Sequence, residues 1–322
     1  MRAIVQERFG RPKDVLQLRD VEQPAPRQGE VLVRVAAASV AKGDWLIATG
    51  QPYIARPSYG LKRPKQHVAG LEVAGTVETA GPDAIRFESG DEVFGWCNGA
   101  FADYVVVPEE QLVSKPSNVT FEEAAALPVS GFAALQAVRD CGRVEAGQRV
   151  LVIGASGGVG SLAVQIAKTF DAEVTGVAST KNIDLVRSLG AEHVIDYTQE
   201  TIAGHSRIFD VIIDIAGNRP LSELRKVLAP TGKLVIVGGT GGAATMGFGR
   251  TVRAAVLSPF VKPDLVPLMS KPNRADLETL RDLAESGRIR AVVDQAYPLD
   301  QTPSVVEQLG AGRSSGKRVV TV

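Results

Sequence analysis

Over the first 120 residues, short apolar segments alternate with turns that contain glycine and proline. The segments are rich in valine and too short for amphipathic helices, so they predict β-strands. The clearest of these strands are Ala3–Val5, Val31–Val35, Val73–Val77 and Tyr104–Val107. Because helical periodicity is scarce here, this region predicts a small β-rich domain.

The pattern changes near residue 121, where Phe121–Leu127 and Gly131–Val138 have the composition of helices. After Gly147, apolar strands alternate with helices. The predicted strands are Arg149–Ile153, Glu173–Ala178, His193–Asp196, Phe209–Ile215 and Lys233–Gly238. The predicted helices are Gly158–Phe170, Ile183–Leu189 and Pro220–Leu228. Such alternation is typical of a parallel sheet that is covered by helices on both faces.

The last part of the chain returns to β character. Ala275–Glu285 predicts a late helix, and Lys317–Val322 predicts a strand that rejoins the first domain. A chain of 322 residues is long enough for two domains. We therefore predict an α/β protein in which residues 1–122 with 288–322 form the β-rich domain and residues 123–287 form the domain with the parallel sheet.

Charge and cysteine content narrow the possible functions. The 36 Lys and Arg residues balance 36 Asp and Glu residues without a long block of one sign, so neither nucleic acid nor a membrane surface is an expected partner. Cys97, Cys141 and the three histidines are scattered, which argues against a disulfide framework and against a zinc cluster. The amino-terminal segment has no apolar signal-peptide core, so we expect a cytoplasmic protein.

A glycine-rich turn joins the strand Arg149–Ile153 to the helix Gly158–Phe170. Glycine lets a pyrophosphate approach the backbone, and a helix amino-terminus offers N–H groups and a positive dipole end to phosphate. In this context the turn predicts a dinucleotide site, although such a turn can also be purely structural. Its glycines are Gly154, Gly157, Gly158 and Gly160. The last of them lets the helix pack closely on the sheet.

The same turn also fits the G-x-S-x-G pattern of serine hydrolases, with Ser156 as the nucleophile. That chemistry needs a histidine base and an acid further along the chain. The only later histidines, His193 and His205, fall within the next units of the sheet and not after a late strand. A hydrolase is therefore only a minor alternative.

The end of the second strand of this unit, Glu173–Ala178, distinguishes the two nicotinamide dinucleotides. NAD sites place an Asp or Glu there to hold the ribose 2′-hydroxyl. Here Ser179, Thr180 and Lys181 follow, so two hydroxyls and an ammonium are available for a 2′-phosphate and no carboxylate at that position repels it. These residues favour NADPH. Alternatively, Ser179 caps a helix that starts near Asn182, and Lys181 is only solvated.

Six motifs occur in order along nearly the whole chain. They are HVAGLEVAGTVETAG at 67–81, GDEVFG at 90–95, GAFADYVVV at 99–107, AAALPVSGFAALQAV at 124–138, GASGGVG at 154–160 and LGAEHVIDY at 189–197. Together they resemble the medium-chain dehydrogenases/reductases, in the zinc-free branch that is similar to quinone oxidoreductases. The resemblance implies a GroES-like substrate domain built from both ends of the chain, with a Rossmann domain, a doubly wound parallel sheet, between them.

The resemblance also implies where NADP(H) binds. Residues of the glycine-rich turn meet the pyrophosphate, those after the second and third strands meet the adenosine phosphate, and those after the later strands line the ribose and the nicotinamide. The implied cofactor-binding residues are Ser130, Ser156, Gly157, Gly158, Val159, Gly160, Ser179, Thr180, Lys181, Tyr197, Ala216, Gly217, Val237, Gly238 and Gly239. For the later glycines, ordinary turn chemistry is the alternative.

Two positions depart from the zinc-dependent members of this family. Ala41 stands at the position of a cysteine ligand and Leu71 at the position of a histidine ligand, so no catalytic zinc is expected. Many zinc-free members carry an asparagine at the position of Ala41, close to the substrate. Lys42 and Asp44 are candidates to replace it, unless they are solvated or structural.

Without a metal to polarise oxygen, the favoured reaction is hydride transfer from NADPH to a quinone or to an activated C=C or carbonyl group. Tyr53 matches the position of a functional tyrosine in related enoyl-thioester reductases, and it is a candidate proton donor or aromatic wall. Phe94, Trp96 and Phe101 are candidates for an apolar substrate wall or for the core. Alternatively, the fold binds NADPH without catalysis.

The expected partners are a small hydrophobic electrophile and a second copy of the chain. Asp264–Ser270 is a candidate edge strand through which relatives form dimers by extending the sheet. Pro263 and Pro267 weaken this prediction of a homodimer, because proline cannot donate to a strand ladder.

Overall fold

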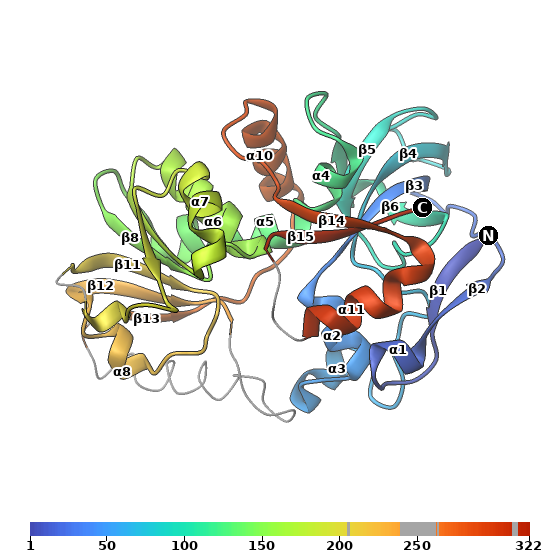
Figure 1. Cartoon of the computed structure of the whole chain (residues 1–322). Helices are drawn as coiled ribbons and strands as arrows, with labels where there is room; N and C mark the ends of the chain where they lie inside the picture. The colour runs from blue at the N-terminus through green and yellow to red at the C-terminus, as the bar shows by residue number, and fades with distance from the viewer. Residues whose placement is uncertain (205–206, 239–261, 263, 311–314) are drawn as a thin grey trace. The chain divides into compact units, whose positions relative to one another are not determined.

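The computed structural model describes residues 1–204, 207–238, 262, 264–310 and 315–322. These residues form two compact units, Met1–Ser130 with Pro272–Val322 and Gly131–Lys271 (Figure 1). Each unit has its own sheet and its own hydrophobic core.

The first unit is built on a seven-stranded sheet with the order β14–β15–β3–β4–β5–β7, in which β6 also pairs with β3. A separate antiparallel pair consists of β1 and β2. The strands are β1 Arg2–Gln6, β2 Leu16–Asp20, β3 Glu30–Val40, β4 Glu72–Ala80, β5 Glu92–Trp96, β6 Tyr104–Pro108, β7 Leu112–Ser114, β14 Val293–Pro298 and β15 Lys317–Thr321. The four strands predicted for the first 120 residues are confirmed as β1, β3, β4 and β6.

Strand β3 shows how the sequence places this core. Val31, Val33 and Val35 alternate along it and all belong to the hydrophobic core, as the two-residue period of a strand requires. The last strand, β15, lies antiparallel to β3 and pairs Val320 with Ala38. The prediction that the end of the chain rejoins the first domain is therefore confirmed.

The helices of the first unit are mostly short. They are α1 Pro12–Val15, α2 Lys42–Thr49, α3 Arg56–Tyr59, α4 Phe121–Ala125, α10 Arg274–Glu285 and α11 Thr302–Gly310, and α5 Pro128–Leu135 contains the division between the units. Helix α4 begins with a capping box, in which the Thr120 hydroxyl accepts from the Glu123 N–H (3.2 Å) and the Glu123 carboxylate accepts from the Thr120 N–H (2.9 Å). No helix among the described residues combines the length and apolarity needed to cross a bilayer.

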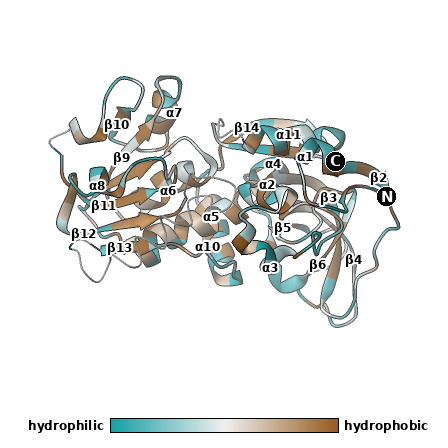
Figure 2. Cartoon of the chain, turned by 90° about the horizontal axis from the view of Figure 1, so that it is seen from below, coloured by the Kyte–Doolittle hydropathy of each residue, from teal (hydrophilic) through white to brown (hydrophobic). Residues whose placement is uncertain are grey.

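The second unit contains a six-stranded sheet with the order β10–β9–β8–β11–β12–β13, and all its pairings are parallel. Its strands are β8 Arg149–Ile153, β9 Glu173–Ala178, β10 His193–Asp196, β11 Phe209–Asp214, β12 Leu228–Ile236 and β13 Asp264–Pro267. Its helices are α6 Gly158–Thr169, α7 Ile183–Ser188 and α8 Leu221–Leu224, with a π-helical segment at Gln136–Gly142. Hydrophobic residues dominate β11 and the end of β12 (Figure 2), where residues 211–213 and 234–236 are buried, as expected for strands that are covered on both faces. Numbered within the sheet, the strand order is the doubly wound 3-2-1-4-5-6.

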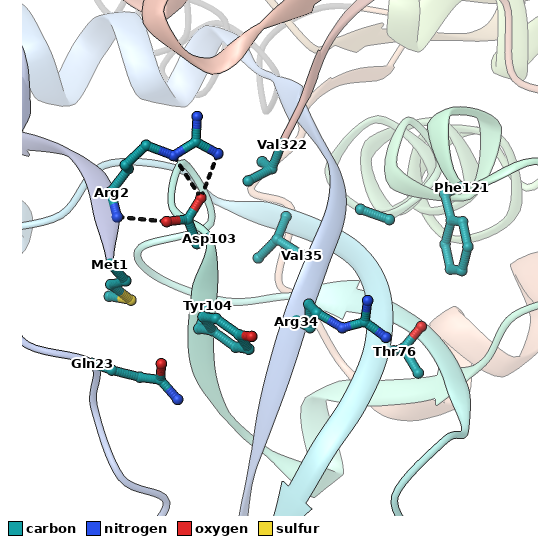
Figure 3. A pocket seen from close by; sticks show the side chains of 11 residues that line it. Met1, Arg2, Gln23, Arg34, Val35, Thr76, Asp103, Tyr104, Phe121 and Val322 are labelled. Atoms are coloured by element: carbon teal, nitrogen blue, oxygen red, sulfur yellow. Dashed lines mark hydrogen bonds and ion pairs between the residues drawn. The ribbon is translucent and has the colours of Figure 1, made fainter.

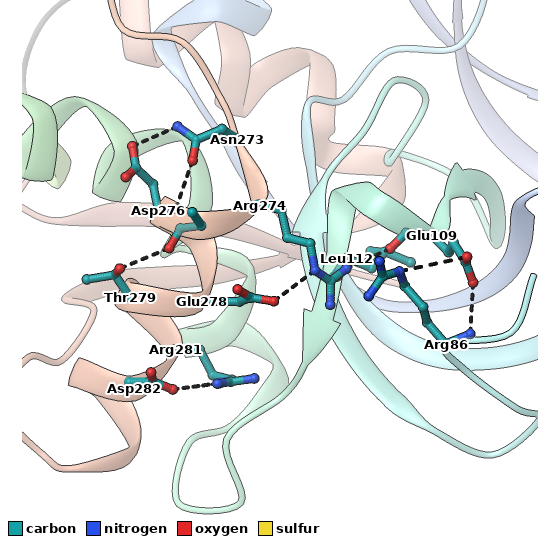
Figure 4. Close-up of polar contacts among 11 residues, drawn as sticks. Arg86, Glu109, Leu112, Asn273, Arg274, Asp276, Glu278, Thr279, Arg281 and Asp282 are labelled. Atoms are coloured by element: carbon teal, nitrogen blue, oxygen red, sulfur yellow. Dashed lines mark hydrogen bonds and ion pairs between the residues drawn. The ribbon is translucent and has the colours of Figure 1, made fainter.

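The division between the units differs from the predicted boundaries. Residues 123–130 and 272–287, which the sequence pattern assigns to the parallel-sheet domain, fall in the first unit. Helix α10 is held there by Arg274, whose guanidinium donates to the carbonyls of Glu109 (3.2 Å) and Leu112 (2.8 Å) on the neighbouring β7 segment (Figure 4). These contacts join α10 to the β-rich unit although its helical pattern resembles that of the other one.

The prediction of a helix at Pro220–Leu228 followed by a strand at Lys233–Gly238 is partly wrong. Helix α8 covers only Leu221–Leu224, and β12 already begins at Leu228. The physical reason is that Leu228 already pairs with Phe209 of β11, ahead of a β-bulge. The residues between Leu224 and Leu228 therefore connect α8 to β12 and cannot continue the helix.

Strand β13, the candidate for dimer formation, lies at one edge of the described sheet and ends at Pro267. Pro263 lies outside the described residues. The homodimer stays a prediction.

Candidate functional site

The glycine-rich turn leaves the carboxyl end of β8 and leads directly into α6. Gly154 adopts a left-handed backbone conformation (φ +88°), which glycine tolerates best. The N–H groups of Gly154 and Ala155 both point to the Val177 carbonyl oxygen, at 3.3 and 3.1 Å. The turn is therefore held against the end of β9, and Gly157 occupies the position just before the helix.

Glycine is needed for different reasons at two positions of the turn, Gly160 and Gly157. A Cβ atom on Gly160 would overlap the Gly154 carbonyl oxygen, so close packing of α6 on the turn requires glycine there. A Cβ atom on Gly157 would lie 3.5 Å from the same oxygen, which is an ordinary contact. Packing within the chain therefore explains Gly160 but not Gly157. Close approach of a ligand to the backbone explains a glycine at 157.

Helix α6 presents its amino-terminus at this turn. The first N–H groups of any α-helix have no intrahelical acceptor, and the helix dipole is positive there. No acidic residue stands in the first turn of α6, which begins with Gly158, Val159 and Gly160. The turn thus fits the pyrophosphate of a dinucleotide, since it offers donors and no competing carboxylate.

Asn182 connects this turn to the segment after β9. It is buried (7% exposed), and its amide nitrogen donates to Ser156 Oγ (3.1 Å) and to Ser179 Oγ (3.3 Å). A serine hydroxyl that accepts from an amide keeps its own proton for another acceptor. Asn182 therefore orders two hydroxyls as donors, one in the glycine-rich turn and one after β9. Ser179 does stand at the N-cap position of the 3-10 helix Thr180–Asn182, but its side chain makes no capping hydrogen bond there.

The neighbouring Thr180 has a different partner. Its hydroxyl donates to Asp196 Oδ2 (2.5 Å), and Asp196 Oδ1 accepts from the hydroxyl (2.7 Å) and the N–H (2.9 Å) of Thr198. Asp196 ends β10, where it pairs with Ala178, the last residue of β9. No acid follows β9 directly, but Asp196 at the end of β10 still supplies a carboxylate at this edge.

Lys181 and Tyr197 complete this edge. Both side chains are exposed, Tyr197 by 53%, and the Tyr197 N–H donates to the Ala178 carbonyl (3.1 Å). In the described part of the chain, Lys181 has no ion pair or hydrogen bond. Its ammonium is therefore available to an anionic ligand.

The segments after β11 and β12 lie at the same end of the sheet. The Gly217 N–H donates to Asp214 Oδ1 (2.9 Å), while the N–H groups of Val237 and Gly238 donate to the Asp214 carbonyl (3.0 and 3.2 Å). Ala216 lies against Gly154. Gly239 lies outside the described residues. The carboxyl ends of β8, β9, β10, β11 and β12 thus bring together the predicted cofactor residues of the second unit that the structure describes, at the edge where doubly wound sheets bind ligands, whereas Ser130 belongs to the first unit.

The hydrolase alternative does not agree with the positions of the histidines. His193 begins β10 and pairs with Glu173 (3.3 Å) at the start of β9, which is the opposite end of the parallel sheet from Ser156. His205 lies outside the described residues. The Ser156 hydroxyl instead accepts from Asn182.

The first unit holds a buried polar cluster that the sequence pattern does not reveal. The Glu72 side chain is fully buried and forms an ion pair with Lys317, which is 6% exposed. The other carboxylate oxygen of Glu72 accepts from the Val129 N–H (2.9 Å). Because charged groups are rarely buried without a partner, this pair secures the start of β4 to the start of β15.

Asp44 lies close to this pair. One of its oxygens accepts from the Ala41 N–H (2.7 Å) at the start of α2, and the other is buried without a hydrogen bond to any described residue. Burial, followed by the charge of Glu72, raises the pKa of Asp44 to about 7, although the Ala41 hydrogen bond and Lys317 act in the opposite direction. Asp44 is thus structural at the start of α2 and titrates near neutrality.

The positions of family zinc ligands carry hydrocarbon side chains, Ala41 and Leu71, which cannot bind a metal. Cys97 is buried, and burial together with the charges of Asp44 and Glu72 raises the pKa of its thiol. Among the described residues, no group of three or more His, Cys, Asp or Glu side chains is arranged to hold a metal ion. Ala41 and Leu71 therefore do not fit the ligand set of a catalytic zinc, and a reaction without zinc stays a prediction.

The remaining candidates lie in the first unit. Tyr53 is 52% exposed, and its ring stacks under the Arg56 guanidinium (4.6 Å). Trp96 is half-buried, and Ser130 is buried (4% exposed) in α5. Phe94 and Phe101 are fully buried, and Phe101 belongs to the hydrophobic core, so its assignment to a substrate wall is replaced by a core role.

A surface pocket of about 510 Å³ lies elsewhere on the first unit (Figure 3). Its lining includes Arg2, Arg34 and Tyr104, but none of the predicted cofactor or substrate residues. The Arg2 guanidinium is bound to Asp103 (2.7 Å). The pocket therefore adds no residue to the candidate site.

Comparisons with known proteins agree with this geometry. Residues 27–117 match the alcohol dehydrogenase GroES-like domain, and residues 189–320 match a family described as zinc-binding dehydrogenase. The chain is 32% identical over 335 residues to a chloroplastic quinone-oxidoreductase homolog of Spinacia oleracea, covering 99% of this chain and 98% of that protein. It is 32% identical over 329 residues to a mitochondrial NAD(P)H oxidoreductase of Homo sapiens, covering 91% and 82%. The quinone oxidoreductase of Coxiella burnetii has a similar structure, with a TM-score of 0.85, 28% identity, and coverage of 100% and 99%.

A GroES-like unit and a Rossmann unit with a glycine-rich turn define an oxidoreductase that uses a nicotinamide cofactor. The chain belongs to the medium-chain dehydrogenase/reductase family, in its quinone-oxidoreductase-like group.

Proposed function

We propose that this chain is an NADPH-dependent oxidoreductase that transfers hydride, without zinc, to a quinone or to an activated C=C or carbonyl group. The observation that carries the choice of NADPH is the pair of serine hydroxyls, Ser156 and Ser179, which Asn182 keeps as donors. Lys181 stands beside them with its ammonium exposed. Donors and a cation in this position favour a phosphate over a neutral hydroxyl.

Different segments of the second unit would bind different parts of the cofactor. Gly157, Gly158, Val159 and Gly160 would receive the pyrophosphate at the amino-terminus of α6. The 2′-phosphate would meet Ser179 and Lys181 and the exposed Tyr197, and the segments after β11 and β12 would line the ribose and nicotinamide. When bound, the reduced nicotinamide supplies a hydride, so the chain itself has to orient the acceptor and deliver a proton.

Two features support an acceptor that needs no metal. Ala41 and Leu71 cannot bind zinc, so nothing at these positions would polarise an alcohol oxygen. A quinone or an enone is already electrophilic, which makes it the easier acceptor. Tyr53, exposed and next to the Arg56 guanidinium, is the candidate to donate a proton or to orient the acceptor.

The test of cofactor choice is a fluorescence titration of NADPH and NADH into wild-type protein and Lys181→Ala. Loss of one ammonium from a 2′-phosphate site lowers NADPH affinity by about tenfold and leaves NADH within about twofold. Lys226→Ala, which removes another exposed lysine of the same unit, is the matched control and leaves both affinities unchanged. Equal loss for both nucleotides in Lys181→Ala, or no binding by the wild type, contradicts the proposal.

The test of catalysis is NADPH oxidation with a panel of quinones and enones. We expect turnover with at least one class, and Tyr53→Phe should lower kcat by about tenfold or more if the phenol donates the proton. A chain that binds NADPH tightly but reduces no member of the panel would instead be a nucleotide-binding protein on the same fold.

A further inference from the structure

The three residues after β9 do not contribute to the phosphate site in the same way. Ser179 accepts a hydrogen bond from Asn182 and keeps its proton, whereas Thr180 gives its proton to Asp196. A hydroxyl has one proton and an ionised carboxylate can only accept. Thr180 therefore offers an incoming phosphate only oxygen lone pairs, which phosphate oxygens repel.

The Asp196 carboxylate is fixed in this position. It accepts from both the Thr180 and the Thr198 hydroxyls, whose oxygens lie 2.9 Å apart, and it is only 7% exposed. The Thr180 hydrogen bond is the main cause that holds the pKa of Asp196 below its ordinary value, so the carboxylate is charged at neutral pH. Its charge thus stands one hydroxyl away from the place where a 2′-phosphate would bind.

In the part of the chain that the structure describes, no cation pairs with Asp196. Glu200, also at the end of β10, accepts from the Asp196 N–H (3.2 Å) and adds a second negative charge. Lys181 is exposed and not bound to either carboxylate in the described part of the chain. Among the described residues, the edge therefore combines the Lys181 ammonium, which attracts a 2′-phosphate, with the fixed Asp196 carboxylate, which repels it.

From this network we infer that Asp196 is a specificity-determining residue that weakens binding of the 2′-phosphate and so keeps NADH usable beside NADPH. The inference rests on the proposed function, since it concerns the same nucleotide edge. Thr180, placed above among the cofactor-binding residues, then acts as the partner that holds Asp196 and not as a phosphate ligand. NADPH preference comes from Ser179 and Lys181, and Asp196 limits it.

The test uses two nucleotide fragments that differ only in the 2′-phosphate, namely 2′,5′-ADP and 5′-AMP. Each is titrated into the full chain by calorimetry. Asp196→Asn removes the charge and keeps the shape of the side chain. We expect it to tighten 2′,5′-ADP binding by about fivefold to tenfold, from the loss of one partly screened repulsion, and to leave 5′-AMP within about twofold. An unchanged ratio of the two affinities, or weaker binding of 2′,5′-ADP, overturns the inference.

Three further variants separate the causes. Glu200→Gln removes a neighbouring charge that bonds to backbone and not to Thr180, and should change the ratio by less than about twofold. Thr180→Val should not weaken 2′,5′-ADP by more than about twofold, whereas a direct Thr180–phosphate hydrogen bond would make it weaken. If Asp196→Asn does not fold, Asp196→Ser also removes the negative charge and should tighten 2′,5′-ADP binding in the same direction.

The outcomes also separate this inference from the proposed function. If the wild type binds 2′,5′-ADP and 5′-AMP but Asp196→Asn leaves their ratio unchanged, only the inference fails. If the wild type binds neither fragment and neither NADPH nor NADH, the nucleotide site itself is wrong, and the inference falls with it.

Discussion

Each of the two units contains an ordered group of polar side chains. The groups differ in whether their hydrogen-bond donors find an acceptor inside the protein. In the first unit, the Lys317 ammonium is buried and bound to Glu72, so donor and acceptor satisfy each other inside the protein. In the second unit, Asn182 holds Ser156 and Ser179 so that their protons remain available. Ordered donors whose protons bond to none of the described residues identify a binding edge better than buried charge does.

The largest expected effect is a loss of stability when the buried Glu72–Lys317 pair is broken. Lys317→Met leaves the buried Glu72 carboxylate without its cation and should destabilise the protein by about 3–5 kcal/mol. Urea unfolding followed by circular dichroism measures this loss. Arg187→Met, which removes an exposed cation paired with Asp184, is the control and should cost less than about 1 kcal/mol. Equal effects would mean that the buried pair is not what holds β4 to β15.

The next effect is a pH dependence from Asp44. Because its folded pKa is raised to about 7 from an ordinary value of 3.8, the folded state binds a proton that the unfolded state releases. This contribution to stability is present at low pH and is lost as the pH rises through 7. When the pH rises from 5 to 8, the free energy of unfolding of the wild type should therefore fall by about 2–3 kcal/mol more than that of Asp44→Asn, which has no carboxyl group at this position to titrate. Parallel pH curves for the two proteins would show that Asp44 does not titrate in this range.

A substitution that disturbs packing at the glycine-rich turn should cause a smaller loss of stability. Gly160→Ala places a methyl group into the Gly154 carbonyl oxygen, and the shift of α6 that follows should cost about 1–3 kcal/mol. Thermal unfolding measures the change. A fully stable Gly160→Ala protein would show that α6 can move away from the turn without loss.

The smallest expected effect tests the direction of the serine hydroxyls. Asn182→Asp keeps the shape but turns the donor into an acceptor, so the protons of Ser156 and Ser179 point inward. NADPH affinity should fall by about tenfold, or about 1.4 kcal/mol. Asn98→Asp, at an exposed position of the first unit, is the control for the added charge. Unchanged NADPH binding in Asn182→Asp would remove the distinction drawn between the two polar groups.

Local patterns were sufficient for much of the fold. The alternating valines of β3 and the strand–turn–helix order of the second unit follow from periodicity, which is a local property. The position of α10 does not follow from it, because the Arg274 contacts with Glu109 and Leu112 join segments far apart in the chain. The early start of β12 likewise depends on the pairing of Leu228 with Phe209.

The site was predictable where chemistry follows directly after a strand. Ser156 and the residues from Ser179 to Lys181 are of this kind. Asp196 was not predicted, because the acid of NAD sites follows the second strand of the unit, whereas this acid ends β10. The signal was present, since parallel neighbouring strands align their carboxyl ends and Asp196 closes the predicted strand 193–196. The Glu72–Lys317 pair had no local signal at all.

The most direct test of the account is calorimetric titration of NADPH into Gly157→Ala beside the wild type. A methyl group at this position makes only an ordinary contact with its neighbours, so the free energy of unfolding should fall by no more than the ~1 kcal/mol that alanine costs at an N-cap position. It would stand where the pyrophosphate approaches, so NADPH affinity should fall by about tenfold or more. A stable Gly157→Ala protein that binds NADPH as tightly as the wild type would contradict the claim that this turn holds the dinucleotide.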